Sequence, residues 1–315
     1  MKESFSPTNS ENSRKEFIKK ITALGIGAFL MPKEIFSEPS QESQEQNRGV
    51  ETSVMKEMEG HGNLPDGFYR SKINIKFEGE KEIEGAGSFF SIEDKQKAKV
   101  DFLSNKEHPE FFAGGVDFEG IERYYKSQGK EIVLVVAGAY YAPRTKDIEG
   151  IALEKGKTVG QDQPKSGSNG LLVMKDGNPE IQYVNQIPDF TNYINELKSE
   201  NASAFQQTSY LRPGGQFSSS NPTKWELRFF VEGETNGKPQ KGVLNFSTPM
   251  TYTEAVEAMK EMKGFTITKA IGLDTGNMSE GYFYDKNNGK NLMIDEQVGK
   301  HRNEYTNIIV FFSKP

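Results

Sequence analysis

An aspartate in the C-terminal part of the chain has the sequence context of a site residue. Asp274 directly follows the apolar segment 270–273 and precedes a glycine-containing turn. An acid at the end of a buried strand is held rigidly, and loops on a rigid scaffold carry most binding and catalytic groups. Its carboxylate can accept a proton, bind a sugar hydroxyl or hold a divalent cation. The alternative is an aspartate that only accepts hydrogen bonds from the amides of its turn.

Three uncharged polar side chains near other strand ends could bind the same ligand. Gln207 can hydrogen-bond through both ends of its amide. Tyr140 and Tyr141 follow the apolar run 131–136 and can stack on a sugar ring or donate to phosphate. The alternatives are a glutamine in solvent and two tyrosines that pack against the core.

Two cations and two turn residues complete the set of candidates. Lys224 and Arg228 can neutralise a phosphate, and arginine offers two parallel donors. On an alternating strand, however, such residues commonly form the face exposed to water. Gly276 and Ser279 would line the pocket beside Asp274. We expect Ser279 to be a turn hydroxyl and not a nucleophile, because no histidine lies near it in the sequence to activate it.

The composition excludes several other kinds of site. The chain has 315 residues, a formal charge of −6 and a pI near 5.4, which argues against a nucleic-acid partner. It has no cysteine, so a thiol nucleophile, a disulfide and a thiolate metal site are excluded. Its three histidines, His61, His108 and His301, lie in polar surroundings, and we expect no histidine triad or histidine-rich metal centre. No cofactor is expected, although a divalent cation at Asp274 stays open.

The N-terminal residues have the order of an export signal. A basic segment, 13–20, precedes an eleven-residue apolar run, 21–31, which is too short to span a bilayer. The basic segment is similar to a twin-arginine signal in which Lys15 replaces the second arginine. We therefore predict a signal peptide over 1–37 and an exported, periplasmic or extracellular protein without a transmembrane helix in the mature chain. The alternative is an amphipathic helix in a cytosolic protein.

The rest of the chain is predicted to form a linker and one domain. Residues 38–66 are rich in Glu, Gln, Ser and Gly, and cannot bury enough apolar surface to remain ordered. Residues 67–315 show the alternating and continuous apolar runs of β-strands. We expect an α+β domain with a mixed, largely antiparallel β-sheet core and few helices. A hairpin is predicted around the turn 175–179.

The clearest helix is predicted over 252–263. Thr251 and Glu254 have the spacing of a capping box, which satisfies two free amides at a helix start. Val256 and Met259 lie on one apolar face. Gly264 is expected to end the helix.

Read in order, six segments resemble the phosphodiester glycosidase domain, the family of the uncovering enzyme that removes N-acetylglucosamine from a phosphomannose diester. The resemblance spans residues 97–312 and rests on these segments: Val135-Val-Ala-Gly-Ala-Tyr-Tyr141, Ile148-Glu-Gly-Ile-Ala-Leu-Glu-Lys-Gly156, Asn169-Gly-Leu-Leu-Val-Met-Lys-Asp-Gly177, Ala204-Phe-Gln-Gln-Thr-Ser-Tyr-Leu211, Phe246-Ser-Thr-Pro-Met-Thr251 and Ala270-Ile-Gly-Leu-Asp-Thr-Gly-Asn-Met-Ser279. It implies a divergent bacterial member in which Asp274 is the site aspartate. The chain departs from the family pattern at three points: Ala137 replaces an asparagine, Thr275 replaces a glycine, and the family's central-strand arginine has no unambiguous counterpart, since Lys224 and Arg228 are both possible.

The resemblance leads to one expected function and two alternatives. The first is an exported hydrolase that cleaves a glycosidic phosphodiester or a related envelope sugar linkage, with a sugar or sugar-phosphate ligand. The second, favoured by Ala137 and Thr275, is a catalytically inactive carbohydrate- or phosphate-binding envelope module of the same fold. The third is an envelope protein whose sheet edge binds a partner. The sugar, the stereochemical course and the oligomeric state do not follow from the sequence.

Overall fold

The structure is a computed structural model that describes residues 50–53, 64–65, 68–77, 83–92, 96–142, 144–217, 219–262, 264–274, 282–285, 290–293 and 305–314. The chain divides into two units, Met1–Asn47 and Arg48–Pro315, and all described residues belong to the second. The predicted signal peptide and two predicted site residues, Gly276 and Ser279, lie outside the described residues.

The described residues form three antiparallel sheets. The first contains β1 (Val50–Ser53), β2 (Phe68–Phe77), β3 (Ile83–Ile92), β14 (Lys238–Met250), β13 (Trp225–Thr235), β15 (Thr266–Leu273), β11 (Ser209–Arg212) and β12 (Gly215–Gln216), in this spatial order. The second has the order β7 (Lys157–Thr158), β6 (Ala152–Glu154), β10 (Ser203–Gln207), β8 (Gly170–Lys175) and β9 (Asn178–Tyr183). The third has the order β17 (Lys290–Met293), β16 (Tyr282–Asp285), β5 (Glu131–Ala137), β18 (Asn307–Ser313) and β4 (Ala98–Ser104).

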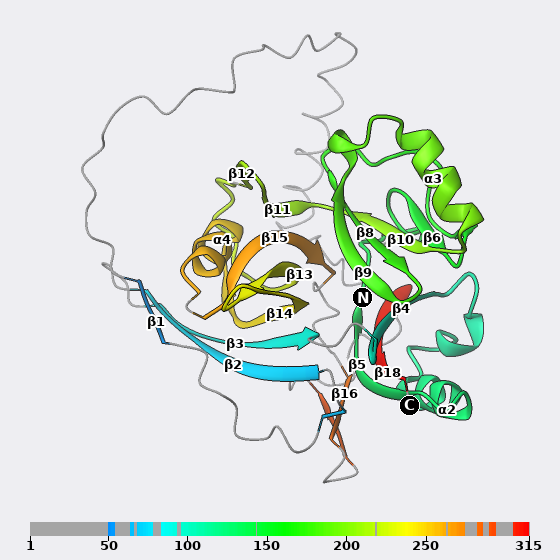
Figure 1. Cartoon of the computed structure of the whole chain (residues 1–315), viewed down its shortest axis with the longest axis horizontal. Helices are drawn as coiled ribbons and strands as arrows, with labels where there is room; N and C mark the ends of the chain where they lie inside the picture. Colours follow the sequence, from blue (N-terminus) through cyan, green and yellow to red (C-terminus); the bar gives the residue numbers. More distant parts are fainter. Residues whose placement is uncertain are drawn as a thin grey trace, which may run out of the picture. The chain divides into compact units, whose positions relative to one another are not determined.

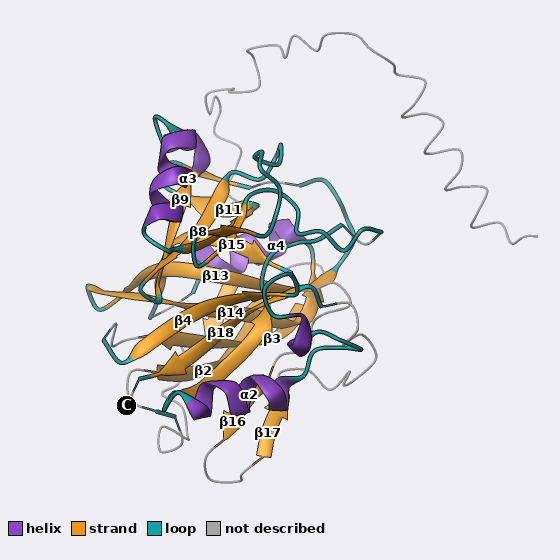
Figure 2. Ribbon diagram, turned by 90° about the vertical axis from the view of Figure 1, so that its right-hand side faces the viewer, coloured by secondary structure: helices purple, strands orange, loops and turns teal. Residues whose placement is uncertain are grey.

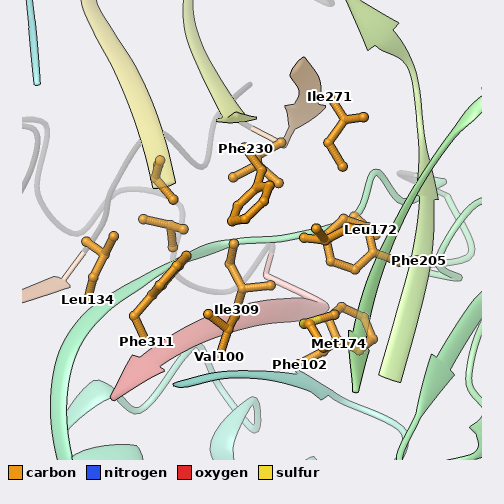
Figure 3. Packing of buried hydrophobic residues seen from close by; sticks show 14 of the residues in the cluster. Val100, Phe102, Leu134, Leu172, Met174, Phe205, Phe230, Ile271, Ile309 and Phe311 are labelled. Atoms are coloured by element: carbon orange, nitrogen blue, oxygen red, sulfur yellow. The ribbon is translucent and has the colours of Figure 1, made fainter. Parts of the chain in front are cut away.

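One hydrophobic core joins the inner faces of all three sheets. Figure 3 shows Phe230 and Ile271 of the first sheet, Phe205 of the second and Ile309 and Phe311 of the third packed together. Buried apolar area is the dominant stabilising contribution to folding. Because every sheet contributes to the same core, the three sheets form one domain, as the sequence predicts.

Each sheet also has an outer face that a helix covers (Figures 1 and 2). α4 (Tyr252–Lys260) packs on the first sheet, α3 (Phe190–Ser199) on the second and α2 (Phe118–Ser127) on the third. Short 3₁₀ turns occur at Pro109–Phe111 and Val184–Gln186. The described part of the chain is thus α+β, mostly β with three α-helices, which confirms the predicted fold class. The named strands pair in antiparallel fashion, and the only parallel pairing between described residues is a single bridge, Ile151 to Gln161.

Local sequence signals account for the form of individual elements. The capping box is present: the Thr251 side chain accepts from the Glu254 amide, and the Glu254 carboxylate accepts from the Thr251 amide. The helix ends at Lys260, three residues before the predicted end, although Gly264 does adopt a left-handed φ of 86°. The predicted hairpin joins β8 to β9 through Asp176 and Gly177, whose φ angles of 50° and 73° are typical of a tight hairpin turn.

Two parts of the segment 38–66, the predicted linker, are described. β1 pairs with β2 at the edge of the first sheet, and Leu64 is half-buried against the central core. The domain boundaries as a whole stay a prediction.

Two buried carboxylates join the sheets to one another. Glu232 on β13 accepts from the Ile181 amide of edge strand β9 at 2.7 Å and pairs with Lys241 and Lys269 at 3.3 and 3.0 Å. The two lysines also donate to the carbonyls of Pro179 and Ile181. Side chains of the first sheet thereby satisfy backbone groups that an edge strand would otherwise leave free.

The second carboxylate, Glu154 on β6, joins the second sheet to the third. It accepts from the Ser104 amide and hydroxyl at 2.9 and 2.6 Å, and His108 Nε2 lies 3.0 Å from its other oxygen. The hydrogen bond to Glu154 raises the pKa of His108, an effect that burial opposes and the charges of Glu154 and Glu110 reinforce. We call the Glu232 and Glu154 clusters the two seams.

Candidate functional site

The C-terminal end of β15 is the point at which four strands from all three sheets meet. The Asp274 amide donates to the Gly138 carbonyl, just beyond β5, at 2.9 Å, and the Gly272 amide donates to the Thr208 carbonyl, just beyond β10, at 3.0 Å. On the other side of β15, Arg228 of β13 pairs with Leu273. Asp274 directly follows β15 and is buried at the position where these strand ends converge.

Gln207 ends β10 beside this point and has an unusual environment. Its side chain is fully buried, and neither its amide oxygen nor its amide nitrogen has a hydrogen-bond partner among the described residues. A buried amide without partners costs about 1–3 kcal/mol. Such a group is rare in folded proteins and requires an explanation. A ligand that bonds to the amide would supply one.

Arg228 is buried on the inner face of β13, contrary to the alternative of a solvated outer strand face. It is 1% exposed, and its Nε donates to Asn245 Oδ1 on the neighbouring strand β14 at 3.2 Å. A buried guanidinium requires hydrogen bonds and opposite charge around it. Its position in the sheet places a fixed positive charge beside Leu273, one residue before Asp274.

Tyr140 belongs to a cluster of three tyrosines next to Asp274. Its hydroxyl and that of Tyr252 both hydrogen-bond to Tyr210. Burial, with contributions from Tyr252 and Asp274, raises the pKa of Tyr140, and burial likewise raises the pKa of Tyr210. Both hydroxyls therefore stay protonated and can donate. Gly272 permits this packing, since a Cβ there would lie 2.8 Å from both the Tyr140 hydroxyl and the Tyr210 ring.

Asn307 lies at the candidate site and is not among the residues predicted from the sequence. Its Oδ1 accepts from the Ala139 amide at 2.6 Å, and its Nδ2 donates to the Ala139 carbonyl at 3.0 Å. It therefore holds the turn that carries Tyr140. The available signal was a polar residue at the start of the apolar strand 307–312, and Asn245 gave a comparable signal inside β14.

Two predicted ligand-binding residues lie elsewhere. The side chain of Lys224 is on the surface and pairs with Glu254 at 3.1 Å, at the start of α4. Tyr141 packs against the hydrophobic cluster under α2, on the outer side of the third sheet. The structure thus brings Gln207, Arg228, Asp274 and Tyr140 to one strand end and separates Lys224 and Tyr141 from them.

Three further observations concern cavities, metal sites and membrane spans in the described structure. A cavity of about 520 Å³ lies at the β8–β9 turn and includes none of the predicted site residues in its lining. Within the described residues, no group of three or more His, Cys, Asp or Glu side chains is arranged to hold a metal ion. None of the described helices has the length and apolar character needed to cross a bilayer.

The described residues thus form a three-sheet α+β domain with a cluster of buried polar side chains at one strand end. No protein-family model matches the sequence, and curated protein sequences include no match. Among solved structures, the catalytic domain of zebrafish N-acetylglucosamine-1-phosphodiester alpha-N-acetylglucosaminidase, in a form auto-inhibited by its pro-peptide, matches with a TM-score of 0.52. The match covers 83% of this chain and 87% of that one at 12% sequence identity. The chain is therefore similar in fold to this phosphodiester glycosidase.

Proposed function

We propose that this protein hydrolyses a glycosidic phosphodiester and that the end of β15 is its active site. The observation that carries the proposal is Gln207, a fully buried amide without a hydrogen-bond partner among the described residues, near a buried Asp274. Both oxygens of the Glu232 carboxylate have partners, whereas the Gln207 amide has none among the described residues, and this contrast favours a ligand at Gln207. The similarity in fold to a phosphodiester glycosidase supports the same reaction class.

In the proposed reaction, water adds to the anomeric carbon of the sugar while the bond from that carbon to the phosphate oxygen breaks. The products are the free sugar and a phosphomonoester. Asp274 either accepts the proton of the attacking water or delivers a proton to the departing oxygen. Arg228 offsets the negative charge that grows on the phosphate.

The remaining residues hold the sugar. Gln207 binds hydroxyls with both ends of its amide, and Tyr140 donates from a hydroxyl that remains protonated. Gly276 and Ser279 would line the same pocket, and Tyr141 and Lys224 would contribute only if the bound ligand extends beyond the strand end. No cofactor is part of the proposal, although a divalent cation at Asp274 is compatible with it. Export to the periplasm or the cell exterior is proposed on the N-terminal signal alone.

The test is an assay with N-acetylglucosamine-1-phospho-sugar diesters. A positioned acid–base group contributes about 10²–10⁴-fold in rate, so Asp274→Asn should lower turnover by about that factor. Folding should survive, because asparagine keeps the shape and the backbone bond to Gly138 is unchanged. Circular dichroism and the unfolding midpoint of the variant check this. If Asp274→Asn instead unfolds the protein, or turns over the diester as fast as the wild type, the aspartate has no catalytic role.

One observation favours a second function, a binding module without activity. Ala137, at the position of the family's asparagine, is fully buried in the cluster under α2 and pairs with Ile308, so it offers no polar group to a ligand. A wild-type protein that binds sugar phosphates without cleaving any diester would support this module.

A further inference from the structure

A polar pocket lies at the starts of β5 and β10, two strands whose other ends meet at the candidate site. It has a volume of about 330 Å³ and is lined by residues of the second and third sheets. Lys130 precedes β5, Lys155 lies in the turn between β6 and β7, and Lys314 follows β18. A strand rises about 3.3 Å per residue, so the two ends of the seven-residue strand β5 lie on the order of 20 Å apart. The pocket is thus separate from the site at Asp274.

Within the described part of the chain, the three lysines Lys130, Lys155 and Lys314 form no ion pair with a carboxylate. Among the described residues, the ion pairs of lysine involve other side chains, and none reaches the ammonium groups of Lys130, Lys155 or Lys314. Neighbouring lysines normally repel one another, and this arrangement costs free energy that a bound anion would recover.

Lys130 is held in place and not free to turn away. Its ammonium group lies 5.3 Å from the ring centre of Tyr125 and 4.7 Å from that of Phe312, within cation–π distance of both. Burial lowers the pKa of Lys130; the charge of Asp101 opposes this change, and the charges of Lys155 and Lys314 add to it. The two rings thereby hold a partly desolvated cation at the wall of the pocket, next to two further cations.

Three acidic residues also line the pocket, and two of them, Glu200 and Asp101, interact with side chains outside its lining. Glu200 pairs with Lys175 at 2.7 Å, and Asp101 accepts the Tyr125 hydroxyl at 2.9 Å. The negative charge of Asp176 would repel an anion. Lys99 donates to Asn178 at 3.0 Å and adds a fourth positive charge to the wall of the pocket. Positive groups therefore outnumber negative ones. Ser203 and Asn201 provide neutral donors.

We propose that the pocket between Lys130, Lys155 and Lys314 binds a phosphate-type oxyanion. Ammonium groups on three separate segments can each donate to a different oxygen of such a group. The ligand is either inorganic phosphate or the phosphate of a phosphorylated sugar. Its binding is independent of the reaction proposed at Asp274.

The experiment measures binding of inorganic phosphate, and separately of a hexose monophosphate, to the full chain by the rise in unfolding temperature at constant ionic strength. A ligand that binds only the folded state raises stability in a saturable way. The test variant is Lys130→Gln/Lys155→Gln/Lys314→Gln. Its matched control, Lys106→Gln/Lys238→Gln/Lys260→Gln, makes the same change in net charge at exposed lysines outside the pocket.

We expect saturable binding to the wild type and the control, and an affinity at least about tenfold lower in the test variant, since it loses its charge-assisted hydrogen bonds. Tighter binding of the hexose phosphate than of phosphate identifies the sugar as part of the ligand, and equal affinities identify the ion alone. Asp274→Asn should bind as the wild type does. Where the triple variant does not fold, Lys155→Gln, on an exposed turn, should still weaken binding.

Three results would overturn the proposal. They are a stabilisation that never saturates, an equal loss of binding in the control variant, and a loss of binding in Asp274→Asn with full binding in the lysine variant. The last of these would place the phosphate at the end of β15 and would leave the proposed reaction intact.

Discussion

The seam at Glu232 and the end of β15 lie on the same strand pair, β13 and β15. They differ in whether their buried polar side chains have hydrogen-bond partners. At the seam, both carboxylate oxygens of Glu232 have partners on the strands that they join. At the end of β15, Gln207 is also buried, and its amide has no partner among the described residues. The seam is complete without a ligand, whereas the strand end retains hydrogen-bonding capacity. A buried polar group without a partner is expected where a protein binds a ligand.

The largest effect should follow from breaking the seam. Glu232→Gln removes the charge that Lys241 and Lys269 share. Removing one partner of a buried ion pair costs about 3–5 kcal/mol, and we expect about 2–3 kcal/mol here, because both lysines can reach water. Urea denaturation measures the loss. Glu200→Gln, which breaks an exposed pair with Lys175, is the control and should cost less than about 1 kcal/mol. Equal losses would mean that the seam contributes no more than a surface pair.

Gln206 and Gln207 are adjacent in the chain and allow a buried amide with hydrogen-bond partners to be compared with one that has none among the described residues. The Gln206 amide accepts from the Ile151 and Lys165 amides and donates to the Lys165 and Ser168 carbonyls. Gln206→Leu should therefore lower the free energy of unfolding by about 2 kcal/mol. Gln207→Leu removes an amide that has no partner in the described structure, and it should change the free energy of unfolding by less than about 1 kcal/mol or raise it. A large loss in Gln207→Leu would show that the amide has a structural partner.

At the second seam, the expected effect on the free energy of unfolding is smaller and depends on pH. The pKa of His108 is raised in the folded state, so its contribution is fully present below the pKa of an unfolded histidine. The contribution is lost as the pH rises through the folded-state value. The stability difference between wild type and His108→Gln should thus shrink from low to neutral and higher pH, by on the order of 1 kcal/mol. Unfolding midpoints from pH 5 to 9 measure it.

The controls for this prediction use the exposed neighbour of His108. Glu110→Gln removes a carboxylate that is only 3.3 Å from Nδ1 but lies at the surface, and it should leave most of the pH dependence in place. A difference between wild type and His108→Gln that is constant with pH would mean that His108 is neutral in both states.

Much of the fold could be predicted from the sequence, because strand and helix signals are local. The alternation in 98–102, the continuous apolar run 131–136 and the capping box at Thr251 each depend on residues close to one another in the chain. Helix length was less predictable. The glycine signal at Gly264 does not determine where the last helical turn packs, and α4 ends at Lys260, before the predicted end.

Asp274 could be selected from the sequence because its position at a strand end is a local feature. Its neighbours are decided by the tertiary structure. Arg228 and Lys224 are equivalent candidates in the sequence, but the register of β13 against β14 and β15 turns Arg228 inward, and Lys224 reaches Glu254 on the surface. Asn307 contacts Ala139 across 168 positions, and no local pattern indicates such a contact. The sequence by itself determines which segments form strands and which end in polar residues. Only the packing of three sheets around one core decides which of those ends meet, because that packing depends on contacts between distant parts of the chain.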